Sequence, residues 1–481
     1  MELINLFKYD PSGGDDFWEA IRQIPGYPNE DTIPLKAMLI ESGAHLRLPE
    51  VLADLTGDPA GEVLAVMDLI PMRRGPDELK MLMLKSLRTA GWQPHPLVLL
   101  PDDSGQVLTD MARTEGVKKR IQSGVPVLSI GSGVVTDIAK HACYLHEQET
   151  GEHIPFVVYQ TANSVIAYTS NMTPIIVNGA RRTFPSRYPD AILSDLETLC
   201  DAPAEMTAAG VGDLIAAFTS LADWHLAHRL GMDDDYNEFA YILMSGMDQI
   251  LIAYAEDIRT GTFEGMAALA KLVHLAGLAM SLSHTTAPMS GYEHAIAHTL
   301  DMVNESTGLP IGRHGNEVAL ASVVCSLAYQ SFLDEFDPGK IDLEAAHPKP
   351  DALKAMIFQA VSQLDNTGKT AEECWANYQV KLNRWNERKR YLETFLTNWH
   401  IIRTELDGLV RSPESLLDIL RAVDGPLRFD ELTPPVPEES ARFAFFYAPL
   451  LRSRLTLGDL LFFSNWDRQK LWKQIWSQMN A

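Results

Sequence analysis

Three segments in the second half of the chain carry side chains that commonly bind metal ions. Asp213 lies among small residues in MTAAGVGDLIAAF, and His314 precedes a glycine in GRHGNEVALA. Between them, MSGYEHAIAHTL places His294 and His298 four residues apart, which is one turn of a helix. One carboxylate and two imidazoles suit Zn²⁺ or a similar first-row ion and leave coordination positions open for a substrate. The residue types therefore indicate a metal site of the catalytic kind.

The histidine pair also has an ordinary structural explanation. On an alanine-rich helix, a pair at this spacing is more often solvated or hydrogen-bonded than bound to a metal. The HExxH motif of thermolysin-type proteases is absent, because alanine follows His294. The residue types alone leave both interpretations open.

A glycine turn in the first half of the chain has the pattern of a phosphate-binding loop. In VPVLSIGSGVVTDIAKHACYL, an apolar strand leads into Gly131, Ser132 and Gly133, and a helix with one apolar face follows. The glycines allow a ligand to approach the backbone, and the free N–H groups of a helix start favour a phosphate or pyrophosphate. A plain tight turn is the alternative.

Asp68 ends an earlier apolar strand, LAVMD. A carboxylate in this position accepts the two ribose hydroxyls of NAD and repels the 2′-phosphate of NADP. Its alternative role is that of a helix cap or turn residue.

The elements that must position these residues change in kind near residue 200. Before it, β-branched runs alternate with helical patterns, which predicts an α/β unit with a largely parallel sheet. The clearest runs are Val63–Ile70, Pro96–Leu100, Val125–Ile130, Ile154–Tyr159 and Ala191–Ser194, with Thr173–Val177 leading into a predicted hairpin turn at Asn178-Gly179.

After residue 200, helical periodicity dominates. We therefore expect a Rossmann-like N-terminal domain over residues 1–200, with 1–32 as an extension, and an all-helical domain over residues 201–481. The site is expected in the cleft between them.

Composition excludes several classes of function. The net charge of −24 disfavours binding to nucleic acid or to anionic membranes, both of which need a basic surface. The start of the chain lacks the pattern of a signal peptide, and the apolar stretch Met266–Leu282 contains Lys271 and His274 and is expected to fall short of a membrane span. The four cysteines form no CxxC pair. These features predict a soluble cytoplasmic protein.

Several segments, in order, resemble one known family. They are GSGVVTDIAK, QTANSVIAYTS, the hairpin followed by RRTFPSRYPDAILSDL, DAPAEMTAAGVGDLIAAFTSLADW, SGYEHAIAH, RHGNEVALAS and RFAFFYAPLLRSRLTLGDLL. This order is similar to that of the sn-glycerol-1-phosphate dehydrogenase branch of the iron-containing alcohol dehydrogenase superfamily, with dehydroquinate synthase and glycerol dehydrogenase as more distant members. The resemblance runs from about residue 35 to near 465, and residues 1–32 and much of 336–395 have no counterpart.

The resemblance implies roles for individual residues. The metal ligands would be Asp213, His294 and His314, while His298 would lie near nicotinamide and substrate as a catalytic residue. Long-chain members carry a further histidine four residues after the aspartate, where this chain has Ala217. The residues expected to bind NAD are Asp68, Gly131, Ser132, Gly133, Asp137, Thr161 and Ser164.

The chain departs from the family at a substrate-facing position. The branch usually reads T-A-x-S-x-D, whereas this chain places Ile166 where the aspartate stands. An isoleucine cannot accept a hydrogen bond, and an unmatched hydroxyl in a dry site costs on the order of 1–3 kcal/mol. Either Asn163 or Asn171 takes over this contact, or the substrate differs from glycerol 1-phosphate.

The resemblance implies a metal-dependent NAD(H) oxidoreductase that interconverts a small, phosphorylated polyol and its ketone. The metal would be Zn²⁺, with Ni²⁺ or Fe²⁺ as alternatives, and the expected assembly is a homodimer. If the substrate carries a phosphate, the nearest cationic candidates are Arg181, Arg182, Arg187 and Arg313, to which the sequence assigns no site role. A dehydroquinate-synthase-like lyase that uses NAD transiently, and a non-catalytic scaffold, are the alternatives.

Overall fold

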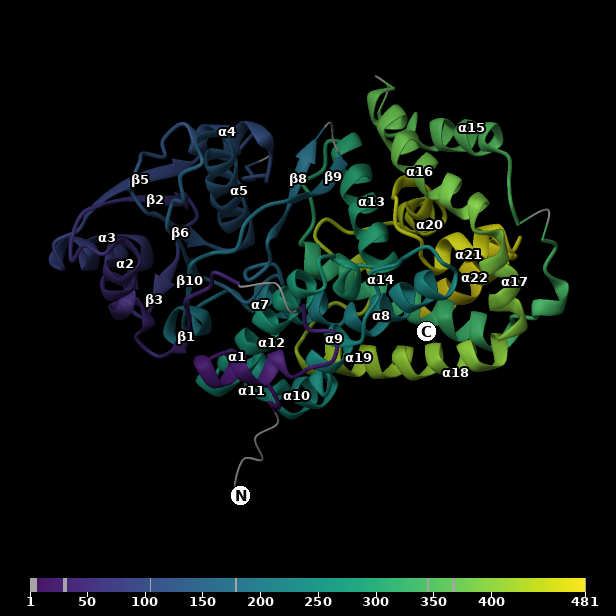
Figure 1. Ribbon diagram of the computed structural model, residues 1–481, viewed down its shortest axis with the longest axis horizontal. Coiled ribbons are helices and arrows are strands. Elements are labelled where there is room, and N and C mark those ends of the chain that lie inside the picture. The colour runs from purple at the N-terminus through teal and green to yellow at the C-terminus, as the bar shows by residue number, and fades with distance from the viewer. Residues whose placement is uncertain are drawn as a thin grey trace.

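The computed structural model describes residues 7–28, 33–103, 105–177, 180–343, 346–365 and 368–480. A sheet-containing half and a helical half lie side by side (Figure 1). The Asn178-Gly179 turn lies outside the described residues, although the hairpin strands on either side of it are described.

The strands belong mainly to one parallel sheet. Within the described residues, it has six strands in the order β1-β10-β7-β6-β2-β5, and every adjacent pair is parallel. The strands are β1 (Ala37–Glu41), β2 (Glu62–Asp68), β3 (Arg73–Arg74), β4 (Asp77–Glu78), β5 (Gln93–Leu99), β6 (Val127–Gly131), β7 (Phe156–Gln160), β8 (Met172–Val177), β9 (Ala180–Pro185) and β10 (Ala191–Asp195). The pairs β3–β4 and β8–β9 are antiparallel hairpins.

The predicted strands are confirmed to within three residues at each end, but β1 was missed. The central strands β6, β7 and β10 are buried along their whole length and read as apolar runs, as strands covered on both faces do. The edge strand β1, AMLIE, is only half-buried and contains one β-branched residue, so its sequence gives a weak strand signal.

Helices cover both faces of the sheet. The side chains of α2 and α3 pack in one apolar cluster with one face, whereas α5 and helices of the second half share the cluster on the other face. The helices of the first half are α1 (Asp15–Arg22), α2 (Leu48–Thr56), α3 (Leu79–Thr89), α4 (Met111–Lys118), α5 (Gly133–Thr150) and α6 (Leu196–Cys200), with the 3₁₀ helix η1 (Ala44–Arg47).

The second half is helical throughout its described residues, as predicted. Its helices are α7 (Ala204–Leu214), α8 (Ala217–Arg229), α9 (Phe239–Leu243), α10 (Met247–Ala253), α11 (Ala255–Thr260), α12 (Phe263–Leu282), α13 (Tyr292–Ser306), α14 (His314–Glu335), α15 (Pro350–Val361), α16 (Lys369–Glu387), α17 (Lys389–Thr397), α18 (Trp399–Leu409), α19 (Pro413–Ala422), α20 (Glu438–Tyr447), α21 (Leu457–Phe463) and α22 (Arg468–Met479), with 3₁₀ helices η2 (Ala287–Met289), η3 (Pro338–Lys340), η4 (Phe429–Glu431) and η5 (Ala448–Leu451).

The N-terminal segment packs on the helical half, although the sequence placed it with the sheet domain as an extension. Asp10 forms an ion pair with Lys271 of α12 at 2.6 Å, and the ring of Tyr27 lies 5.8 Å from that of Phe239. The buried side chains of Phe17 and Ile21 on α1 join the same apolar cluster. In Figure 1, α1 lies beside α11 and α12.

The apolar helix α12 is longer than its sequence suggested. Its 20 residues satisfy the length and composition of a membrane span, so the expectation that this stretch falls short of one is wrong on length. Within the structure, 89% of its apolar window is buried, which is the environment of a core helix.

Candidate metal and cofactor site

Asp213, His294 and His314 meet at one point, although more than a hundred residues separate the first from the last. Asp213 comes from α7, His294 from α13, and His314 is the first residue of α14. One donor atom from each side chain lies within 4.8 Å of the others. The Oδ1 atom of Asp213 is 3.2 Å from Nε2 of His294 and 3.9 Å from Nε2 of His314.

The donor set fits a divalent metal ion. Oδ1 of Asp213 is buried and faces the two imidazoles without a well-aligned hydrogen bond from any described residue. Burial lowers the pKa of His314 to about 3, so its imidazole is neutral and can bind a metal. Burial also lowers the pKa of His294, but the neighbouring carboxylates of Asp213 and Glu293 outweigh it and raise that pKa to about 9. These carboxylates thus favour a positive charge at the centre of the cluster.

Glu293 holds His294 in its orientation, a role that sequence reasoning missed. Its Oε1 atom lies 3.1 Å from Nδ1 of His294, and its Oε2 atom accepts a hydrogen bond from Thr219 at 2.9 Å. A carboxylate on one ring nitrogen directs the other nitrogen to the metal. The adjacent acidic residue in GYEH was the available sequence signal.

His298 lies beside the cluster and outside the group of donor atoms found among the described residues. Its ring centre is 5.2 Å from that of His314 and 6.1 Å from that of His294. The guanidinium of Arg452 contacts Nδ1 of His298, so Nδ1 accepts the hydrogen bond and the ring proton resides on Nε2. Burial, together with the charge of Arg452, lowers the pKa of His298 well below its ordinary value.

The glycine turn opens into the same cavity as the metal-type cluster. Ser132, Gly133, Asp137 and Ser164 line a cavity of about 510 Å³, and Asp213, His294, His298 and His314 line it too. A Cβ atom on Gly133 would come 2.6 Å from a methyl group of Val165, so a side chain would crowd the turn. The start of α5 therefore presents N–H groups at a cavity that also holds the donor cluster.

Four of the predicted cofactor residues are engaged elsewhere or lie behind the cavity wall. Gly131 and Thr161 do not line the cavity; the Thr161 amide donates to the Gly131 carbonyl at 3.3 Å. Asp68 is also outside the lining, and its Oδ1 atom pairs with Lys80 at 2.5 Å. Asp137 lines the cavity but forms an ion pair with Lys140 at 2.9 Å.

Ile166 is buried and lines the cavity, and its backbone N–H donates to Oδ2 of Asp213 at 3.0 Å. Asn163 cannot replace the missing aspartate, because its side-chain amide accepts from Gln160 at 2.8 Å and donates to the Met266 carbonyl at 3.1 Å. Neither Asn163 nor Asn171 lines this cavity. The two asparagines were therefore wrong candidates.

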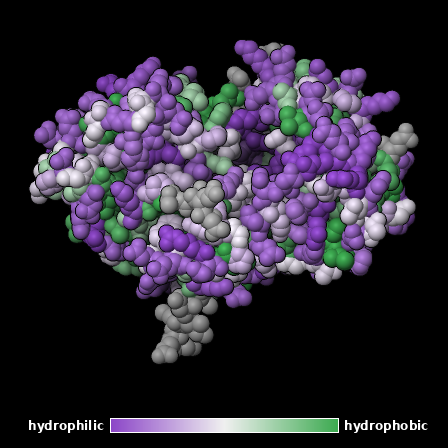
Figure 2. All heavy atoms as spheres, viewed as in Figure 1, coloured by the Kyte–Doolittle hydropathy of each residue, from purple (hydrophilic) through white to green (hydrophobic). Residues whose placement is uncertain are grey.

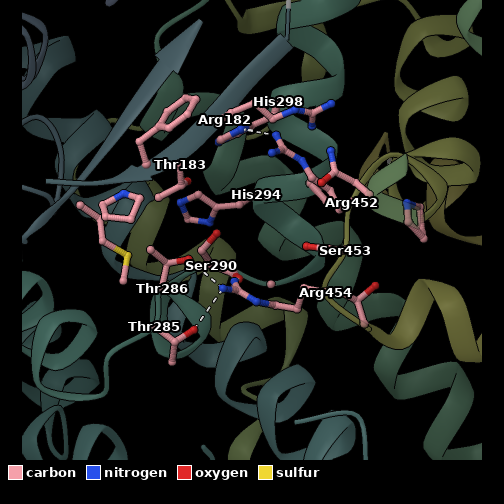
Figure 3. A pocket seen from close by; sticks show the side chains of 18 of the residues that line it. Arg182, Thr183, Thr285, Thr286, Ser290, His294, His298, Arg452, Ser453 and Arg454 are labelled. Atoms are coloured by element: carbon pink, nitrogen blue, oxygen red, sulfur yellow. Dashed lines mark hydrogen bonds between the residues drawn. The ribbon is translucent and has the colours of Figure 1, made fainter. Parts of the chain in front are cut away.

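A second cavity, of about 670 Å³, shares His294 and His298 with the first. Arg182, Arg452 and Arg454 line it, together with hydroxyl side chains (Figure 3). The space-filling view shows a largely hydrophilic surface that is hollowed between the two halves (Figure 2). The two cavities thus meet at His294 and His298.

The four arginines considered from sequence are dispersed. Arg182 lines the second cavity, whereas Arg181 and Arg313 line the first and pair with Asp301 and Glu205. Arg187 is buried in ion pairs with Glu147 and Asp190. Sequence reasoning missed Arg452 and Arg454, although the segment LLRSRLTLGDLL contains both.

Part of the chain matches a family of dehydrogenases, and solved dehydrogenases share its fold. Residues 39–203 match the family described as iron-containing alcohol dehydrogenase. A glycerol dehydrogenase from Schizosaccharomyces pombe superposes with a TM-score of 0.54 at 13% identity, covering 93% of this chain and 92% of that one. An alcohol dehydrogenase from Oenococcus oeni gives a TM-score of 0.55 at 14% identity, covering 92% and 99%. These two likenesses concern the fold.

Two sequence relatives are of the same kind of dehydrogenase. The glycerol-1-phosphate dehydrogenase [NAD(P)+] of Bacillus subtilis is 31% identical over 260 residues, which cover 53% of this chain and 64% of the relative. That of Geobacillus stearothermophilus is 27% identical over 368 residues, covering 76% and 78%. These matches agree with the resemblance of the sequence to the glycerol-1-phosphate dehydrogenase branch of the iron-containing alcohol dehydrogenase superfamily. The chain spans less than two thirds of the length of the Bacillus subtilis relative.

Proposed function

We propose that this protein is a metal-dependent oxidoreductase that transfers hydride between NAD(H) and a small phosphorylated polyol or its ketone. The observation that carries the proposal is the shared cavity, which is lined by both the start of α5 and the Asp213–His294–His314 cluster. The names of the relatives, glycerol-1-phosphate dehydrogenase, support the substrate class.

Each part of the cavity has a defined task in this reaction. Asp213, His294 and His314 would hold one divalent metal ion, which as a Lewis acid stabilises the charge that develops on the reacting oxygen. Glu293 keeps His294 aligned. Ser132 and Gly133 at the start of α5 bind the cofactor phosphates, and Ser164 lines the cofactor path. His298, with its proton on Nε2, donates a hydrogen bond or a proton to the substrate oxygen.

The proposal extends to the metal, the cofactor, the assembly and the substrate. Two imidazoles and one carboxylate match the common ligand set of Zn²⁺, and Ni²⁺ or Fe²⁺ would occupy the same ligands. NAD is the preferred cofactor because of Asp68. The functional assembly is a cytoplasmic homodimer. Because isoleucine occupies position 166, the substrate differs from glycerol 1-phosphate or binds its hydroxyls through other groups, such as Thr183 or Ser290, which line both cavities.

Removal of a ligand side chain tests the proposal. We expect Asp213→Ala and His294→Ala to lose the bound metal, as measured by elemental analysis, and to lose NADH oxidation with polyol-phosphate ketones by at least about 100-fold, as metal-ligand losses do. His95→Ala is the matched control, since His95 is an exposed histidine on β5. Circular dichroism of each variant monitors folding.

Two results would reject the proposal. The first is retention of both metal and turnover in the folded Asp213 and His294 variants. The second is product formation without net change of NADH, which indicates the lyase alternative.

A further inference from the structure

Two arginines of the segment between η5 and α21 face the second cavity with no carboxylate partner among the described residues. Nη1 of Arg452 donates to the carbonyl of Arg181 at 2.9 Å, and Nη2 contacts His298. Nη2 of Arg454 donates to Oγ1 of Thr286 at 2.8 Å, and Nη1 contacts the carbonyl of Ser290. All of these partners are neutral. Neither guanidinium group therefore has a direct ion pair among the described residues, and the carboxylates that act on Arg454, those of Asp233, Glu293 and Asp223, do so at longer range.

The third arginine of the cavity is already neutralised. Nε of Arg182 donates to Oε1 of Glu373 on α16 at 2.6 Å. Arg182 and Glu373 together contribute no net charge to the cavity, so Arg452 and Arg454 are the cations of its lining that have no direct counter-ion among the described residues. Burial and the neighbouring Arg182 lower the pKa of Arg452 to about 9, which agrees with an excess of positive charge there. A dianion would balance it.

The residues around the two arginines supply hydrogen-bond donors, which the oxygens of a phosphate group need as partners. The hydroxyl-bearing residues Thr285, Thr286, Ser290 and Ser453 line the same cavity, and Figure 3 shows Arg452 and Arg454 on the side of it that faces His294. Guanidinium groups bind phosphate oxygens with paired N–H donors, and hydroxyls donate to the remaining oxygens.

We propose that Arg452 and Arg454 bind the phosphate of the substrate and so select phosphorylated over neutral polyols. This inference rests on the proposed function, because it assigns the end of the substrate opposite to the reacting carbon. Arg452 would bind the phosphate and also contacts His298. A bound phosphate therefore also fixes the position of the catalytic imidazole.

Helix α16 closes this site with a segment for which the family resemblance offers no counterpart. Glu373, Ala376 and Asn377 of α16 line the cavity. Because Glu373 neutralises Arg182, it leaves Arg452 and Arg454 as the arginines of the cavity without a direct ion pair among the described residues. The affinity for phosphate is thus expected to depend on a residue outside the shared family core.

Inorganic phosphate is a direct probe of the site. Titration calorimetry of the metal-loaded protein, with saturating NAD⁺ filling the pyrophosphate site, should show one phosphate per chain. We expect Arg454→Gln to weaken this binding by about tenfold or more, since a charged hydrogen-bond donor is lost. Arg259→Gln, an exposed arginine on α11 paired with Glu256, is the control and should bind as the wild type does.

A second variant changes affinity in the opposite direction. Glu373→Gln releases the charge of Arg182 and should tighten phosphate binding by several-fold. Because Glu373 is partly exposed, this variant is informative even if Arg454→Gln does not fold. Unchanged or weaker binding by folded Glu373→Gln, or unchanged binding by folded Arg454→Gln, would overturn the assignment. Malonate serves as a carboxylate probe, and equal affinity for malonate would also overturn the choice of phosphate.

Steady-state kinetics with phosphorylated and neutral ketones distinguish a failure of this inference from a failure of the proposed function. With a phosphorylated ketone, we expect Arg454→Gln to raise KM far more than it lowers kcat, and with dihydroxyacetone it should leave KM unchanged. If no polyol phosphate is turned over by the wild type while phosphate still binds through Arg454, the proposed function fails and the anion site stands. If turnover is normal and Arg454→Gln has the KM of the wild type, the anion site fails.

Discussion

At the scale of single residues, Asp68 illustrates how one side chain can be engaged by two partners. Its Oδ1 atom pairs with Lys80 at 2.5 Å and accepts from the Ile70 amide at 3.1 Å. Lys80 also donates to the carbonyls of Asp68 and Ile70. Both side-chain contacts within the described residues use Oδ1, so Oδ2 remains for a ribose hydroxyl.

We expect Asp68→Asn to lower the preference for NADH over NADPH by about tenfold in kcat/KM, because an amide neither accepts two hydroxyls nor repels a 2′-phosphate. It should also reduce stability by about 1–3 kcal/mol, since Lys80 loses its counter-ion. Glu62→Gln, at the exposed start of the same strand, should change neither quantity. An unaltered cofactor preference in Asp68→Asn would exclude Asp68 from the ribose site.

At the scale of elements, the distance between Asp213 and His314 is set by backbone contact between α7 and α14. A Cβ atom on Gly315 would lie 1.9 Å from the carbonyl oxygen of Ala209, and one on Gly212 would lie 2.3 Å from the carbonyl oxygen of Gly315. Neither approach is possible for a larger residue without moving a helix. The small residues around Asp213 therefore allow the two helices to bring their ligands within reach of one ion.

We expect Gly315→Ala to displace α14 from α7, which should lower the free energy of unfolding by about 1–3 kcal/mol and weaken metal binding. Gly116→Ala is the matched control, because Gly116 lies in α4 with nothing within 4 Å of the added methyl group. Its higher helix propensity should leave metal binding unchanged and stabilise the protein by up to about 1 kcal/mol. Urea unfolding and metal titration measure both effects; equal metal affinity in the two variants would contradict this account of α7 and α14.

At the scale of the whole molecule, the proposed metal ligands join three helices that are distant in the chain. The α7, α13 and α14 helices supply one ligand each, and the cavity they share extends to the glycine turn of the sheet half. A ligand that binds only the native state stabilises it, by about 4 kcal/mol when its free concentration is a thousand times Kd. Metal occupancy should therefore control global stability as well as activity.

We expect chelation of the metal to lower Tm by several degrees, and re-addition of Zn²⁺ to restore it. Asp213→Ala should show the lower Tm from the outset and should not respond to chelator. Differential scanning calorimetry gives both values. A wild-type Tm that is insensitive to chelator after verified metal removal would show that the three helices are held by packing alone.

The sequence determined the local elements and the chemistry they carry. Runs of β-branched and apolar residues and helical patterns located the central strands and the change to helices near residue 200, because these patterns depend on which residues of one segment are buried. The ordered motifs, matched to a known family, singled out Asp213, His294 and His314, and the structure brings all three together.

Only the tertiary structure decided which side chains face the cavity. The side chain of Asn163 donates to the carbonyl of Met266, and Thr161 does not line the cavity. Arg452 and Arg454 line the second cavity from a segment far along the chain. The pairing of Arg182 with Glu373 joins residues 191 positions apart. Such contacts depend on how whole helices and strands dock, and no periodicity within one segment encodes the orientation of its neighbour.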